Sequence, residues 1–195
     1  MSKDIVTHAS KEFLNINYSE RKLHQREFYK CTFRNCNFTK SDLRSNTFED
    51  CVFENCNFTM AIVDGVRFKN ALFKESKLMG IDFSQCNSFM FSFCFEECQM
   101  DYSTFYGTTL KNTRFFKCRL TETDFTEADL KAAVFDQSDL SGTRFHHTDL
   151  QKADFRTALN FSIDPDVNKM KKAKFSAFYL GGLLSKYDLD IDFDK

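Results

Sequence analysis

The chain has 195 residues, with 27 basic and 28 acidic side chains and a formal net charge of −1. This balance excludes a general nucleic-acid binder, which would carry a basic excess, and also a protein that mimics DNA by its overall acidity. No apolar run reaches the roughly 20 residues of a membrane span, and no signal-peptide pattern is present, so we expect a soluble, cytoplasmic protein. The 25 phenylalanines, with no tryptophan and one proline, predict one structural position that is used many times.

Residues 1–24 are expected to form an N-terminal cap, because the open end of a stack of strands invites aggregation. Phe13, Tyr18 and Leu23 keep the spacing of five, which allows irregular coils to begin within this segment.

Residues 25–160 are expected to form repeated coils, because almost every fifth residue is large and apolar. The first block of these central residues is Phe28, Phe33, Phe38, Leu43, Phe48, Phe53, Phe58, Val63, Phe68, Phe73, Leu78 and Phe83. A period of five fits neither a helix nor a flat strand, but it fits a chain that turns a corner every five residues. Four such sides make one coil, so equivalent residues of successive coils stack like parallel strands about 4.8 Å apart.

A register slip is expected within 84–95, because the interval from Phe83 to Phe105 is longer than a full coil of four repeats by two positions. Phe89, Phe91, Phe93 and Phe95 alternate there, which indicates a short strand-like crossing or a bulge.

The second block of central residues runs from Phe105 to Phe155, with Phe and Leu alternating without exception. Phe33, Phe53 and Phe73 are expected to form one internal ladder, and Phe115, Phe135 and Phe155 another. The repeats 123–127, 128–132 and 138–142 (TDFTE, ADLKA and SDLSG) resemble the motif of the pentapeptide-repeat family. That resemblance implies an all-β protein, a right-handed quadrilateral β-helix, in agreement with the spacing.

Residues 161–195 are expected to form a C-terminal coil and a tail with a short helix and strand. Helical spacing relates Leu180, Leu183, Leu184 and Tyr187, and Leu189, Ile191 and Phe193 alternate with aspartates as in a strand. This apolar tail either caps its own solenoid or pairs with a second copy across a two-fold axis. Ile163-Asp164-Pro165 and Gly182 to Asp188 resemble the tail of Qnr-type proteins, in which the helix and strand form a homodimer.

No catalytic, cofactor-binding or metal site is expected. Of the eight cysteines, all but Cys94 occupy the small inward position, without the spacing of a metal site, so we expect buried, reduced thiols. The adjacent His146 and His147 are expected to be a solvated surface pair.

One coil, residues 121–140, is strongly acidic, whereas Lys111, Arg114, Lys117 and Arg119 make the preceding segment basic. Its outward carboxylates are Glu122, Asp124, Glu127, Asp129, Asp136 and Asp139. These acids are either solvated residues of the repeat or a band that a DNA-binding protein mistakes for phosphates.

The Qnr-type resemblance implies a non-enzymatic protein that binds a type II topoisomerase (DNA gyrase or topoisomerase IV). It would protect the enzyme from quinolone-like poisons, partly as a DNA mimic, without binding nucleic acid or membranes itself. The absence of a large inserted loop counts against any mechanism that depends on one. The alternative is a scaffold or binding module with a different protein partner, since fold alone does not give function.

Overall fold

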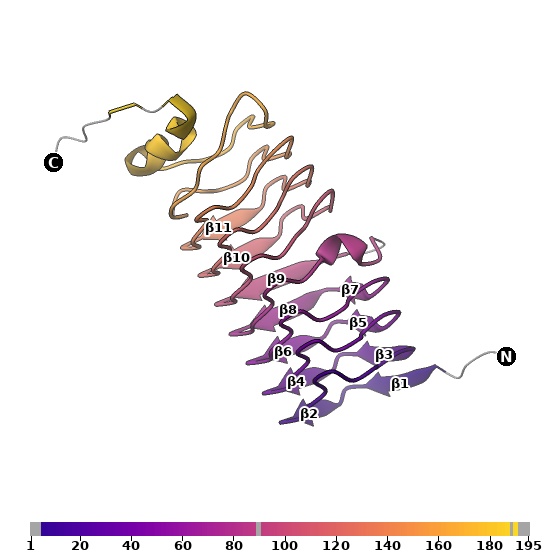
Figure 1. The fold of residues 1–195 in the computed structure, drawn as a ribbon. Helices are drawn as coiled ribbons and strands as arrows, with labels where there is room; N and C mark the ends of the chain where they lie inside the picture. Colours follow the sequence, from indigo (N-terminus) through magenta and orange to yellow (C-terminus); the bar gives the residue numbers. More distant parts are fainter. Residues whose placement is uncertain (1–4, 89–90, 188, 191–195) are drawn as a thin grey trace.

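The computed structural model describes residues 5–88, 91–187 and 189–190, and these form a right-handed, four-sided β-solenoid (Figure 1). All pairings between its strands are parallel, and the strands lie in a four-stranded sheet of order β1-β3-β5-β7 and a seven-stranded sheet of order β11-β10-β9-β8-β6-β4-β2. The strands are β1 Val6–Ala9, β2 Glu12–Leu14, β3 Arg26–Tyr29, β4 Thr32–Arg34, β5 Thr47–Glu49, β6 Val52–Glu54, β7 Arg67–Lys69, β8 Ala71–Lys74, β9 Phe93–Glu96, β10 Arg114–Phe116 and β11 Val134–Asp136. Short 3₁₀ helices are η1 Phe83–Gln85, η2 Ala177–Leu183 and η3 Ser185–Tyr187.

Four faces run along the shaft, and we name each by an inward residue of one coil. Face A carries Phe28 and the four-stranded sheet, and face B carries Phe33 and the seven-stranded sheet. Face C carries Phe38 and face D carries Leu43; these faces are held by isolated parallel bridges between successive coils.

The corners between faces use a left-handed backbone at every fifth residue. Asn35, Lys40 and Ser45 have φ of 52°, 53° and 60°, respectively. This conformation costs a non-glycine residue roughly 1–2 kcal/mol. The next coil offsets the cost, because the corner N–H groups of Asn35 and Lys40 donate to Glu54 and Thr59 carbonyls at 3.0 and 2.9 Å.

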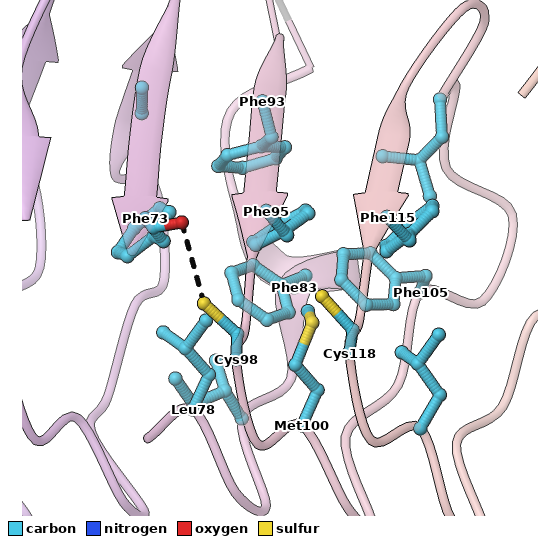
Figure 2. Close-up of a cluster of buried hydrophobic side chains, with 14 of the residues drawn as sticks. Phe73, Leu78, Phe83, Phe93, Phe95, Cys98, Met100, Phe105, Phe115 and Cys118 are labelled. Carbon is cyan, nitrogen blue, oxygen red and sulfur yellow. Dashed lines mark hydrogen bonds between the residues drawn. The ribbon is translucent and has the colours of Figure 1, made fainter. Parts of the chain in front are cut away.

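The two phenylalanine ladders that the sequence predicts are confirmed on face B, where they join into one continuous stack of rings. Its ring centroids are 4.7–5.6 Å apart from Phe13 through Phe33, Phe53, Phe73, Phe95, Phe115, Phe135, Phe155 and Phe175. Phe95 joins the two predicted ladders, and Figure 2 shows it between Phe73 and Phe115. Rings of adjacent faces meet edge to face, as between Phe28 and Phe33.

The offset in residue number between paired positions of successive coils changes once. Phe53 pairs with Phe73 and Phe95 pairs with Phe115, each across a coil of four repeats, whereas the coil that joins Phe73 to its partner Phe95 is longer by two positions. The longer coil therefore keeps the inward column aligned, because Phe73 and Phe95 are direct partners. Phe89 of the predicted alternation lies outside the described residues.

The structure adds detail at both ends of the solenoid. β1 pairs with β3 and β2 with β4, so the predicted N-terminal cap contains a coil from Val6 onward. At the other end, η2 and η3 follow the Phe175 coil, in line with the predicted short helix. Leu189 is described and lies in no strand, and Ile191 and Phe193 lie outside the described residues.

Candidate interaction surfaces

The six carboxylates of the acidic coil all lie outside the core, but they differ in exposure. Glu122 and Glu127 are exposed, whereas the four aspartates are half-buried. Three of the aspartates also accept a hydrogen bond from the backbone N–H two residues later, at Thr126, Lys131 and Ser141. The aspartate before the central residue thus stabilises the corner, which is a structural role.

Cations from neighbouring coils neutralise much of this acidity. Lys111 lies 3.2 Å from Asp129, and Arg114 lies 3.3 Å from Asp136. The basic segment occupies the coil directly before the acidic one, so the two segments pair along the shaft. Arg144 of the following coil lies 3.4 Å from Asp124. The acidic coil is therefore a weaker acidic band than its sequence indicates.

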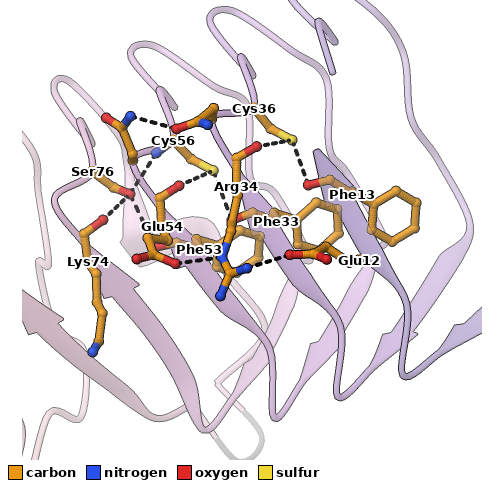
Figure 3. A network of polar contacts seen from close by, with 12 residues as sticks. Glu12, Phe13, Phe33, Arg34, Cys36, Phe53, Glu54, Cys56, Lys74 and Ser76 are labelled. Atoms are coloured by element: carbon orange, nitrogen blue, oxygen red, sulfur yellow. Dashed lines mark hydrogen bonds and ion pairs between the residues drawn. The ribbon is translucent and has the colours of Figure 1, made fainter. Parts of the chain in front are cut away.

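Ion pairs between successive coils also neutralise charged side chains on the N-terminal half of face B. The guanidinium of Arg34 lies between Glu12 at 2.6 Å and Glu54 at 2.8 Å (Figure 3). On face D, Asp42 receives the Arg44 guanidinium at 2.6 Å and His24 Nε2 at 2.9 Å. These hydrogen bonds hold the pKa of Asp42 well below its usual range.

The tail is tied to the last coil and still exposes apolar side chains. Lys186 Nζ lies 2.7 Å from Asp164 and also contacts Asp166, and the Ile163 N–H donates to the Gly182 carbonyl at 2.9 Å. Leu183 packs against the core of its own chain. The exposed apolar side chains are Phe178 (82%), Tyr179, Leu180, Leu184, Tyr187 and Leu189. Of the residues assigned to a dimer interface, Leu180, Leu184, Tyr187 and Leu189 are exposed, and Ile191 lies outside the described residues.

The cysteines are free thiols. Six of them are buried, and Cys86 and Cys94 are half-buried. Cys56 and Cys36 lie beside the phenylalanine stack and donate to backbone carbonyls (Figure 3). Burial raises the pKa of Cys51 to about 12, which keeps that thiol protonated and unreactive.

Within the described ranges, no group of three or more His, Cys, Asp or Glu side chains could hold a metal ion. His146 and His147 are both exposed, and their rings contact each other with centroids 4.1 Å apart. None of the helices in the described part of the chain has the length and apolarity to cross a membrane.

The repeat itself identifies the family. The sequence matches the pentapeptide-repeat family over residues 28–72 as nine copies and over residues 118–156 as eight copies. The chain is a pentapeptide-repeat protein. No curated protein matches this pentapeptide-repeat chain in sequence.

Two solved structures share the fold over nearly the whole length of this pentapeptide-repeat protein. Both are trypsin-treated variants of QnrB1, a plasmid-mediated fluoroquinolone resistance protein, and they differ in the residue that was substituted. The first has a TM-score of 0.62 and 13% identity, and the match covers 97% of this chain and 100% of that one. The second has a TM-score of 0.58 and 13% identity over 95% and 100% of the two chains. At this identity the likeness shows the fold alone.

Proposed function

We propose that this pentapeptide-repeat protein is a non-enzymatic interaction protein of the Qnr kind. It binds a bacterial type II topoisomerase, DNA gyrase or topoisomerase IV, and protects the enzyme from quinolone-like poisons. The observation that carries the proposal is the fold match to a fluoroquinolone resistance protein, which extends over 97% of the chain and so includes most of the tail. A core filled by stacked phenylalanines favours recognition by the outer faces over chemistry in a pocket.

The tail supports the second part of the proposal, a homodimer. Phe178 and Leu184 are exposed at the end of the solenoid, where apolar surface marks an interaction site. Two copies meeting tail to tail would bury these side chains and give a rod with two shafts in line. The exposed members of the interface are Leu180, Leu184, Tyr187 and Leu189, while Leu183 holds the tail to its own coil.

Fewer carboxylates of the acidic coil are available to mimic DNA phosphates than its sequence indicates. Glu122 and Glu127 are its exposed carboxylates, and no described cation lies within ion-pair distance of either. We therefore assign these two residues the main electrostatic role within the coil. Asp124, Asp129, Asp136 and Asp139 contribute chiefly to the stability of their corners and ion pairs.

A supercoiling assay tests the proposal. Purified gyrase is titrated with a fluoroquinolone in the presence and absence of the pentapeptide-repeat protein, with heat-denatured protein as the control. The proposal predicts that the drug concentration for half inhibition rises several-fold. If the inhibition curve does not move and supercoiling is unaffected at micromolar protein, the topoisomerase proposal is wrong and a different protein partner must be sought by affinity capture.

A further inference from the structure

The exposed apolar side chains of the shaft are gathered on one surface. Between residues 15 and 158, the large apolar side chains that are exposed in the described chain are Met60 (55%), Ile62, Tyr102 (67%) and Tyr106. All four lie on face D or on its corner with face C. We call the surface formed by residues 60–65, 80–85, 102–107 and 122–127 the Tyr106 surface.

Backbone pairing places these four stretches on neighbouring coils. Asp82 bridges to Thr104, and Thr104 bridges to Asp124, while the Gly65 N–H donates to the Gln85 carbonyl at 2.8 Å. At about 4.8 Å per coil, the Tyr106 surface is roughly 15 Å long. The exposed apolar side chains therefore share one face of the shaft, on two coils that are separated by the coil of residues 80–85.

The relief of this surface favours contact with another chain. Gly80 leaves room at the corner that the Met60 side chain fills, with Sδ only 2.6 Å from where a Cβ of residue 80 would be, so the exposed Met60 lies along the surface. On the other side of the face, a cavity of about 100 Å³ opens beside Tyr106. Its walls include Phe83, Cys86, Phe91 and Gly107. A cavity of this size accommodates part of one side chain.

The charge of the Tyr106 surface selects the partner. Its four stretches contain five carboxylates, Asp64, Asp82, Glu122, Asp124 and Glu127, and no Lys, Arg or His. Among these acids, Asp124 has an ion-pair partner in the described chain, Arg144 on the next coil. On face A, by contrast, Glu49 pairs with Lys69 and Lys111 with Asp129. The Tyr106 surface is thus the part of the shaft where apolar exposure and unneutralised acidity coincide.

We propose that the Tyr106 surface docks a basic segment of a protein partner, with Arg or Lys side chains next to an apolar residue. The carboxylates attract the cations, the tyrosine rings offer faces on which a guanidinium can lie, and the cavity takes one side chain. The Glu127 carboxylate raises the pKa of the Tyr106 hydroxyl, so these two side chains of the surface act on each other. This proposal does not depend on the partner being a topoisomerase. The Tyr106 surface also differs from the acidic coil, because it follows one face across four coils.

The test compares two variants that remove equal charge. The surface variant carries Asp64→Asn, Asp82→Asn and Glu127→Gln. The control variant carries Glu20→Gln, Asp50→Asn and Glu75→Gln at exposed corner positions elsewhere. A second surface variant, Tyr102→Ser with Tyr106→Ser, removes the rings and keeps the charge. Circular dichroism melting first establishes that all variants are as folded as the wild type.

The probe is a fluorescein-labelled peptide in which arginine alternates with leucine, and binding is followed by fluorescence anisotropy. We expect both surface variants to bind at least about tenfold more weakly than the wild type, and the control variant to remain within about twofold. Equal weakening by the surface and control charge variants would show attraction by general acidity only and overturn the proposal. Unchanged binding by the tyrosine variant would also overturn it.

The same variants separate this inference from the topoisomerase proposal. If the wild type binds the peptide through the Tyr106 surface but does not protect gyrase, the topoisomerase proposal fails and the docking surface stands. If the wild type protects gyrase and the surface variants protect it equally well, the function stands and the Tyr106 surface is not its docking site.

Discussion

The ring of Phe73 stacks on that of Phe95 with centroids 5.6 Å apart and planes 17° apart, although the coil between them is longer than its neighbours by two positions. Every other stacked pair of this column spans a coil of four repeats, as in Phe53–Phe73 and Phe95–Phe115. The phenylalanine stack therefore continues through the change of offset. Phe95 is fully buried and holds the two halves of the shaft together.

Replacement of Phe95 by Ala should remove this junction. We expect the free energy of unfolding to fall by about 3–5 kcal/mol, because a large ring is lost where the coils cannot collapse. Urea unfolding followed by circular dichroism measures the change, and a split transition would show that the halves have uncoupled. Phe116→Ala on the outer side of the same sheet is the control, with an expected loss of about 1 kcal/mol or less. Equal losses would contradict the role of Phe95.

Asp42 should make stability depend on pH. Arg44 and His24 hold its folded-state pKa below that of the unfolded chain, so its contribution is present above about pH 4 and is lost as the pH falls further. Asp42→Asn should lower the melting temperature at pH 7, and its difference from the wild type should shrink at pH 3. Asp50→Asn, at an exposed corner, is the control. A difference that is constant from pH 7 to pH 3 would refute this account.

The exposed tail should set the oligomeric state. Phe178→Glu combined with Leu184→Glu places charges on side chains that do not pack in the core. Light scattering should then report a monomer, whereas the wild type and a Leu14→Glu control at the opposite end report a dimer. A wild type that is already monomeric would mean that the tail is only a cap for its own solenoid.

The thiols should react according to burial. In the folded protein, we expect a thiol reagent such as Ellman's reagent to modify Cys94 first, because it is half-buried on the outer side of β9. The inward thiols, Cys51 among them, should react only after unfolding. Cys94→Ser should abolish the fast phase. Rapid reaction of several thiols in the native protein would show that the coils open readily.

The five-residue period predicted the fold because each central residue repeats one local environment. Phe28 to Phe83 and Phe105 to Phe155 specify inward columns without any long-range information. The stack across the slip was not predicted as continuous, because spacing alone does not reveal that a coil longer by two positions brings Phe95 back into the same column.

The interaction surfaces were harder to predict, because the reach of each side chain decides which charges are left without an ion-pair partner. The ion pairs Lys111–Asp129 and Arg114–Asp136 join residues of successive coils. They can be predicted only by comparing residues one coil apart, and not residues that are neighbours in the sequence. The same comparison reveals the Tyr106 surface, since the stretches 60–65, 80–85, 102–107 and 122–127 contain no cation. The packing of Leu183 against its own coil depends on the path of η2 and has no signal in helical spacing.

The most direct measurement of the proposed function is the amount of linear DNA released from gyrase complexes trapped by a fluoroquinolone. Relaxed plasmid, gyrase and drug are combined with increasing amounts of the pentapeptide-repeat protein, and cleaved DNA is quantified after detergent treatment. Protection predicts that linear DNA falls steadily with added protein and that the Tyr106 surface variants are less effective than the matched charge control. Undiminished cleavage at a molar excess of folded wild-type protein would contradict the proposed function.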